Sequence, residues 1–175
     1  MQILSLEQKN LVIHNLLNEQ VGIVPTDTVY GLVGIYASQF IAKRISHLKL
    51  RDKNKPLAVI VSDIAMAKDI GVITSQVEQL YESYPQGKIT IIVKQKGNTT
   101  ETIAIRITNY RWLQDIIYQT GPLFATSANV HNENSIITIN ENKLEVDFIV
   151  DGGIIDQKAS TVIDATGSEI VIMRS

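Results

Sequence analysis

Three short segments of the sequence hold side chains whose types could bind or transform a ligand. Residues 25–32 (PTDTVYGL) offer hydroxyls, a carboxylate and a glycine that permits close approach of a ligand to the backbone. Lys49 and Arg51 supply an ammonium and a guanidinium, which suit phosphate or carboxylate oxygens. Residues 125–129 (ATSAN) end an apolar stretch with small and hydrogen-bonding side chains. Together these residue types indicate a site for a polar, anionic ligand.

Each segment also has a purely structural interpretation. Residues 25–32 fit an Asx or Ser/Thr turn at the end of a strand, and composition alone favours that turn. Lys49 and Arg51 fit a solvated basic loop, and residues 125–129 fit a plain turn. The residues by themselves leave both interpretations open for each segment.

The positive charges are concentrated in one stretch, although the net charge of the chain is −2. Six of the 16 lysine and arginine residues lie between residues 43 and 55, where Asp52 is the only acid. In an extended backbone Lys49 and Arg51 point to the same side, because side chains two residues apart share a face. We expect this stretch to bind an anionic group.

Two further positions are candidates because of their surroundings in predicted strands. Arg106 lies between apolar residues in the alternating stretch 103–107, which predicts partial burial. A buried guanidinium needs an anionic partner, which either the protein or a ligand can provide. Ser160 and Thr161 precede the last strands, where their hydroxyls can cap a strand or contact a ligand.

The composition excludes several classes of chemistry. The chain of 175 residues has no cysteine, which excludes disulfides, thiolate zinc sites and cysteine nucleophiles. Its three histidines are scattered, and we expect His47 and His131 to face solvent. The Walker A, GxGxxG, HExxH and GxSxG motifs are absent. The first residues do not resemble a signal peptide and no apolar run is long enough to span a bilayer, so we expect a cytoplasmic protein without membrane contact.

Helical and strand patterns alternate along the chain. Apolar spacing predicts a first helix that a Ser5–Gln8 capping box opens and whose buried face includes Leu17. The other predicted helices cover 38–48, 64–70, 75–84, a stretch capped by Asn109, and 140–145. The predicted strands cover 21–24, 56–61, 89–93, 103–107, 123–126, 148–150, 161–164 and 170–173. This alternation predicts the α/β class, with a mixed, twisted sheet in a single domain.

Five segments, taken in order, resemble the YrdC/TsaC family of threonylcarbamoyl-AMP synthases. They are PTDTVYGL, the KxR pair that leads into KPLAVIV, AIRI, ATSAN and STVIDATG, and they extend over nearly the whole chain. The resemblance implies a single YrdC-like domain over residues 1–175 with no additional carboxy-terminal domain. It also implies an open twisted mixed sheet with flanking helices and a concave basic surface.

The resemblance implies an enzyme, an L-threonylcarbamoyladenylate synthase of the nucleotidyltransferase class. It would join L-threonine, bicarbonate or CO2, and ATP, and would release pyrophosphate, with Mg2+ arriving on the triphosphate. A tRNA-modifying threonylcarbamoyl transferase would then pass the threonylcarbamoyl group to the adenosine beside the anticodon. Such adenylation depends mostly on positioning and charge stabilisation, for which cations and hydroxyls suffice.

The resemblance also implies the site residues, carried over one position at a time. The implied ATP and phosphate contacts are Lys49, Arg51, Lys55, Thr102, Ser127, Asn129 and Arg174. Of these, the implied catalytic residues are Lys49, Arg51, Ser127 and Asn129. The implied threonine contacts are Thr28, Arg106, Ala125 and Ser160, with Arg106 suited to the threonine carboxylate. The chain departs from the family at Ile60, where a histidine is common, and in residues 84–87 and 130–133.

Two other functions stay open at this point. A non-catalytic module for double-stranded RNA binding or ribosome maturation would use the same basic surface, and the resemblance allows direct contact with tRNA or double-stranded RNA. However, the chain lacks a strip of basic and aromatic residues for stacking bases. A carbamoyl-transfer relative would instead use carbamoyl phosphate.

Overall fold

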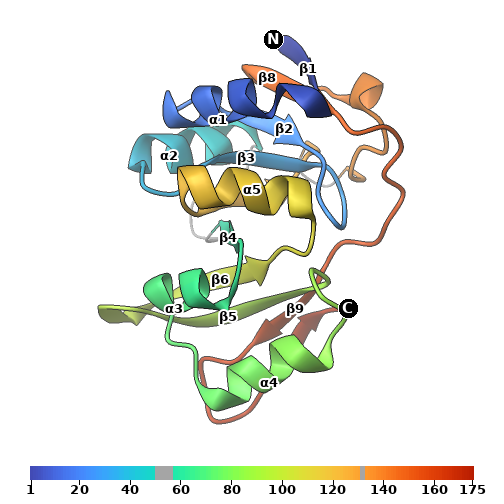
Figure 1. The fold of residues 1–175 in the computed structure, drawn as a ribbon. Coiled ribbons are helices and arrows are strands. Elements are labelled where there is room, and N and C mark those ends of the chain that lie inside the picture. The colour runs from blue at the N-terminus through green and yellow to red at the C-terminus, as the bar shows by residue number, and fades with distance from the viewer. Residues whose placement is uncertain (50–56, 131–132) are drawn as a thin grey trace.

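The computed structural model describes residues 1–49, 57–130 and 133–175 (Figure 1). The strands are β1 (Gln2–Ser5), β2 (Gly22–Val24), β3 (Gly31–Ile35), β4 (Ala58–Val61), β5 (Ile89–Gln95), β6 (Asn98–Ile107), β7 (Leu123–Ser127), β8 (Phe148–Asp151), β9 (Thr161–Asp164) and β10 (Val171–Arg174). The α-helices are α1 (Lys9–Leu17), α2 (Gln39–Leu48), α3 (Ile64–Ile70), α4 (Ser75–Ser83) and α5 (Arg111–Thr120). Two 3-10 turns, η1 (Leu6–Gln8) and η2 (Ile139–Glu141), complete the described elements.

All these strands belong to one sheet, in the order β1-β8-β2-β3-β7-β4-β6-β5-β9-β10. The pairing is mixed: β4 runs parallel to β6 and antiparallel to β7, for example. Figure 1 shows α1, α2 and α5 around the β2–β3 part of the sheet and α3 and α4 around the β5–β9 part. The predicted α/β class with an open mixed sheet and flanking helices is therefore confirmed. In the described parts of the chain, no helix is long and apolar enough to cross a membrane.

Helices pack on both faces of the sheet. On one face, α1 and α5 pack against the buried residues Ile60 and Leu123. On the opposite face, α2 packs against Leu32 and the helices α3 and α4 lie over Val59. Paired residues on neighbouring strands point to the same face, so Ala125, Ala58 and Ala104, which pair across β7, β4 and β6, lie on the α1/α5 face. Arg106 and Thr102 share that face, because they are two residues from Ala104 on β6.

Several predicted elements begin or end elsewhere. The first helix starts at Lys9, after the unexpected strand β1, although Ser5 N–H does donate to Gln8 Oε1 over 2.9 Å. Leu17 was expected to be buried but is 53% exposed, because it ends α1 where the chain turns away. The N-cap of α5 is Tyr110, one residue after the predicted Asn109, and it makes no side-chain capping hydrogen bond. The helix predicted over 140–145 is only the short turn η2.

The ion pair between Arg44 on α2 and Asp147 ties a helix to the start of β8. Arg44 Nη1 and Nη2 donate to the two carboxylate oxygens of Asp147 over 2.5 and 2.8 Å. Val21 N–H donates to the same carboxylate over 2.8 Å. The hydrogen bonds from Arg44 are the main reason that the pKa of Asp147 lies below its ordinary value of 3.8.

Asp147→Asn is expected to lower the free energy of unfolding by about 1–2 kcal/mol at neutral pH, a value reduced for partial exposure of the pair. A depressed folded pKa stabilises the fold above the ordinary pKa, and this contribution is lost as pH falls through the folded value. The difference between wild type and Asp147→Asn should therefore shrink below about pH 4. Urea unfolding across this range measures it, with the exposed Asp69→Asn as control. A difference that does not change with pH would contradict the assignment.

Candidate functional site

Lys49 meets Ser127 and Asn129, which the sequence analysis placed in one site from separate motifs. Lys49 Nζ donates to the Ser127 carbonyl oxygen and to Asn129 Oδ1, both over 2.7 Å, and lies 3.4 Å from Ser127 Oγ. The Lys49 residue is only 4% exposed, so the interpretation of this position as solvated loop is wrong. The prediction that Lys49 and Arg51 point to the same side assumed an extended backbone. The backbone at Lys49 is helical instead, because Lys49 is the C-cap of α2 with φ −82° and ψ −7°. Arg51 and Lys55 lie outside the described residues.

The end of β7 holds the Ser127 and Asn129 side chains in place. Ala128 N–H donates to the Tyr30 carbonyl oxygen over 2.8 Å, which fixes this segment to the start of β3. Ser127 Oγ donates to Asn129 Oδ1 over 2.5 Å. The Asn129 amide nitrogen donates to the carbonyl oxygens of Val130 and Glu133. The amide oxygen of Asn129 is thereby directed toward the Lys49 ammonium, which is buried and held by protein oxygens.

A second group of predicted residues surrounds Arg106. Its Nη1 donates to Thr28 Oγ1 over 2.6 Å and its Nη2 to Thr26 Oγ1 over 3.0 Å. Nη2 also forms an ion pair with the Asp27 carboxylate. The side chains of Arg106 and Asp27 are only 13% and 12% exposed. Partial burial of Arg106 was predicted correctly, and Asp27, to which the sequence analysis gave no role, is its anionic partner.

The electrostatics of this pair follow from burial. Desolvation lowers the pKa of the Arg106 guanidinium, while the charge of Asp27 and its hydrogen bond act in the opposite direction. Arg106 Nε is buried and has no hydrogen-bond partner among the described residues. An unpartnered buried donor is costly, so this atom marks a place where a ligand oxygen would be favourable.

Residues 25–32 form a tight turn and part of the site at once. Thr26 Oγ1 donates to the Val29 carbonyl oxygen over 2.7 Å and accepts from Thr28 N–H over 3.1 Å. The turn expected at this strand end is therefore present. The Thr26 and Thr28 hydroxyls also accept from Arg106. The ligand-binding role predicted for this segment stays a prediction.

Three neighbours enclose Asp27 from the side of β5. Asn109 N–H donates to Asp27 Oδ2 over 2.8 Å. Lys88 Nζ donates to the Asp27 carbonyl oxygen and, over 3.0 Å, to Gln157 Oε1. Gly87 has a φ of +75°, and a Cβ atom on it would collide with the Asp27 carboxylate. The Asp27 side chain is therefore held in one position by charge, hydrogen bonds and close packing.

Ser160 and Arg174, predicted to contact threonine and ATP, lie together. Ser160 Oγ and Thr90 Oγ1 are 2.7 Å apart, and both residues are buried. Arg174 Nη2 donates to the Ser160 carbonyl oxygen over 2.8 Å. Thr102 is exposed on the same face of β6 as Arg106, about 13 Å away along the strand. The roles predicted for Ser160, Arg174 and Thr102 stay predictions.

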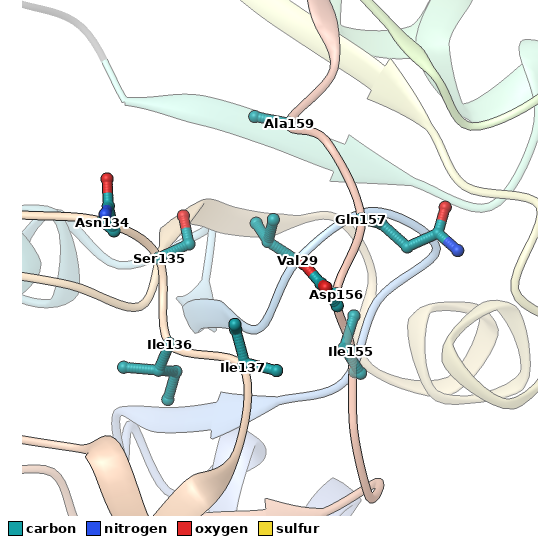
Figure 2. Close-up of a pocket in the computed structure, with 9 residues that line it drawn as sticks. All are labelled: Val29, Asn134, Ser135, Ile136, Ile137, Ile155, Asp156, Gln157 and Ala159. Atoms are coloured by element: carbon teal, nitrogen blue, oxygen red, sulfur yellow. The ribbon is translucent and has the colours of Figure 1, made fainter.

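A pocket of about 270 Å3 adjoins the predicted threonine contacts (Figure 2). Figure 2 shows Val29, next to Thr28, between the segments 134–137 and 155–159, the second of which ends beside Ser160. Ile155 N–H donates to the Ile137 carbonyl oxygen over 3.0 Å, which joins the two segments. The sequence analysis missed both segments, because neither carries a motif or a charge pattern.

Comparisons with known proteins agree with the five-segment resemblance. The model of the Sua5/YciO/YrdC family, described as telomere recombination, matches residues 14–175. A putative threonylcarbamoyl-AMP synthase of Methanocaldococcus jannaschii is 27% identical over 169 residues, or 91% of this chain and 81% of that protein. The threonylcarbamoyl-AMP synthase of Mus musculus is 28% identical over 159 residues, which cover 81% of this chain and 56% of that protein.

A solved structure shows the same fold. The crystal structure of P. abyssi Sua5 complexed with L-threonine matches with a TM-score of 0.89 at 23% identity, over 99% of this chain. The match covers 57% of that chain. The present chain thus spans little more than half the length of the mouse and P. abyssi proteins.

Proposed function

The chain belongs to the Sua5/YciO/YrdC family, and we propose that it is an L-threonylcarbamoyladenylate synthase. Its curated relatives from Methanocaldococcus jannaschii and Mus musculus carry the name threonylcarbamoyl-AMP synthase. The observation that carries the proposal is the contact of the buried Lys49 with the partly exposed Ser127 and Asn129. These three residues are the described members of the catalytic set that the family resemblance implies; its fourth member, Arg51, lies outside the described residues.

The reaction needs no nucleophile from the protein. The threonine amine combines with CO2 and loses a proton, or combines with bicarbonate and loses water, to give a carbamate. One oxygen of this carbamate attacks the α-phosphorus of ATP as pyrophosphate leaves. Negative charge grows on the phosphate oxygens, so a preorganised ammonium stabilises the transition state. Lys49 supplies this charge, and a phosphate oxygen would replace one of the protein oxygens that now accept from its Nζ.

The threonine would bind at the group around Arg106. Its carboxylate suits the Arg106 guanidinium, whose Nε has no partner among the described residues. The Thr28 hydroxyl and the buried Ser160–Thr90 hydroxyl pair offer hydrogen bonds to the polar groups of the ligand. The alanines Ala58, Ala104 and Ala125 place only small side chains on the same face of the sheet as Arg106.

Mg2+ would enter bound to the triphosphate. In the described part of the site the carboxylate is Asp27, and it is already paired with Arg106 and the Asn109 N–H. Phosphate oxygens and water are therefore the ligands expected for Mg2+. The product would serve a separate tRNA-modifying threonylcarbamoyl transferase.

Release of pyrophosphate from ATP tests this proposal. We expect release only when ATP, L-threonine and bicarbonate are all present, because the attacking carbamate forms from the latter two. Carbamoyl phosphate should not replace the threonine and bicarbonate pair. Pyrophosphate release that is indifferent to threonine would reject the function.

Gly87→Ala is expected to raise the KM for threonine by roughly tenfold, because the new Cβ displaces Asp27 and disturbs Arg106. Gly97→Ala is a matched control: Gly97 also has a positive φ, +81°, but nothing lies within 4 Å of its Cβ position. Both variants carry the backbone strain of an alanine at positive φ. Steady-state kinetics with threonine varied should separate them, and equal effects would show that Asp27 is not involved.

A further inference from the structure

The contact between Arg106 and Asp27 places a positive and a negative group side by side in the candidate threonine site. Neither side chain is fully excluded from solvent, because each is slightly exposed. An α-amino acid also carries adjacent opposite charges, because its ammonium and carboxylate are attached to the same carbon. The ion pair in the protein and the zwitterion of the ligand are thus complementary in charge.

Arg106 has donors to spare for a ligand. A guanidinium offers five N–H donors, and three hydrogen bonds to protein groups use three of them. Nε–H has no partner within the described ranges, and the hydrogen bond from Nη1 to Thr28 uses one of the two Nη1 hydrogens. A ligand carboxylate can therefore be bound while the bond to Asp27 is kept.

Asp27 has acceptor capacity to spare in the same way. An ionised carboxylate accepts about four hydrogen bonds. Oδ1 accepts from Arg106 and Oδ2 accepts from Asn109 N–H. A ligand ammonium can use the lone pairs that these contacts leave.

The Asp27 carboxylate offsets the positive charges of Arg106 and Lys88. Lys88 Nζ is fixed to the Asp27 carbonyl oxygen and to Gln157, so two cations lie around one acid. Without the charge of Asp27, Arg106 and Lys88 would attract any small anion, bicarbonate and phosphate included. With it, an anion that brings no positive group meets repulsion from Asp27.

We propose that Asp27 selects an α-amino acid over other carboxylates, by accepting from the ligand ammonium while Arg106 binds the ligand carboxylate. This inference rests on the proposed function, because it concerns the threonine site of the synthase. Asp27 is then a specificity-determining residue and more than a support for Arg106. The ammonium bound at Asp27 must lose a proton before its nitrogen can form the carbamate, because only the neutral amine is nucleophilic.

The test compares ligands that differ by one charged group. L-Threonine carries both groups, (R)-3-hydroxybutyrate lacks the ammonium, and L-threoninol lacks the carboxylate. Their dissociation constants are measured by calorimetry on the wild-type protein, on Asp27→Asn and on the control Asp69→Asn, whose side chain is 79% exposed on α3. Asparagine keeps the size and an acceptor oxygen of Asp27 but removes its charge.

The affinities of the two ligands that carry a carboxylate should respond differently to Asp27→Asn. Wild type and Asp69→Asn should bind threonine at least tenfold more tightly than 3-hydroxybutyrate, the value of one charge-assisted hydrogen bond. In Asp27→Asn we expect threonine to bind roughly tenfold more weakly and 3-hydroxybutyrate to bind equally or more tightly. Threoninol should also bind more weakly, because its single charge, the ammonium, is assigned to Asp27.

Other results would overturn the inference. If Asp27→Asn weakens both acidic ligands equally, Asp27 only holds Arg106 in place. If the variant does not fold, the affinities of the wild-type protein still test the inference. Similar wild-type affinities for threonine and 3-hydroxybutyrate would contradict selection by Asp27. A wild-type protein that binds no threonine at all would instead reject the proposed function, so the two failures are distinguishable.

Discussion

Lys49→Met is expected to reduce kcat/KM for ATP by about 100-fold or more, because removing one preorganised donor to developing charge costs about 10²–10³ in rate. Methionine keeps the length and apolar stem of lysine, so the change isolates the ammonium. Threonine binding in the absence of ATP should change little, because threonine is assigned to Arg106. Initial rates of pyrophosphate release with ATP varied, together with threonine calorimetry, measure both effects.

This variant needs a stability control, because Lys49 is buried. Its removal leaves the Ser127 carbonyl oxygen and Asn129 Oδ1 without their donor, which costs about 1–3 kcal/mol of unfolding free energy. Assays should run well below the melting temperature of the variant. Lys68→Met on α3 is the matched control, because that side chain is 49% exposed and pairs with Glu78. Wild-type ATP kinetics in Lys49→Met would remove Lys49 from the nucleotide site.

Arg106→Gln should have the second large effect, which is on the KM for threonine and not on the KM for ATP. Truncating one partner of a buried, hydrogen-bonded charge pair costs about 2–5 kcal/mol, so we expect the KM for threonine to rise about 100-fold. The KM for ATP should stay within a few-fold of wild type. Rates with each substrate varied in turn separate these two constants.

The same change leaves Asp27 buried without its cation. We therefore expect the unfolding free energy to fall by about 3 kcal/mol, near the lower end for a buried pair because both side chains keep some exposure. Arg111→Gln on α5, where the side chain is 81% exposed, controls for loss of an arginine. Equal increases in both KM values would mean that Arg106 supports the fold and does not bind threonine.

Local patterns were sufficient to predict most of the elements. Ser38 caps α2 through a hydrogen bond from Ile41 N–H, and Ile41 and Ile45 are buried on its inner face, as the spacing indicated. The strand β1 was not predicted because it pairs with β8, almost 150 residues away, and only Leu4 in it is buried. The strand β3 was missed because two of its five residues are glycines, which are rare in strands.

The candidate site was predictable in its residue types and less so in its contacts. Lys49, Ser127 and Asn129 were assigned to one site by family resemblance, and the fold brings them together. The Arg106–Asp27 pair joins residues 79 positions apart, and no local pattern reveals which acid meets a given arginine. The helical backbone at Lys49 was missed because the basic stretch was treated as an extended segment.

Mass spectrometry of the nucleotide product tests the central claim most directly. The protein is incubated with ATP, L-threonine and 13C-labelled bicarbonate, and the products are separated and weighed. The account predicts a nucleotide with the mass of AMP joined to N-carboxythreonine, heavier by one mass unit than the product from unlabelled bicarbonate. Formation of ADP or free AMP alone, or a product without the label, would contradict it.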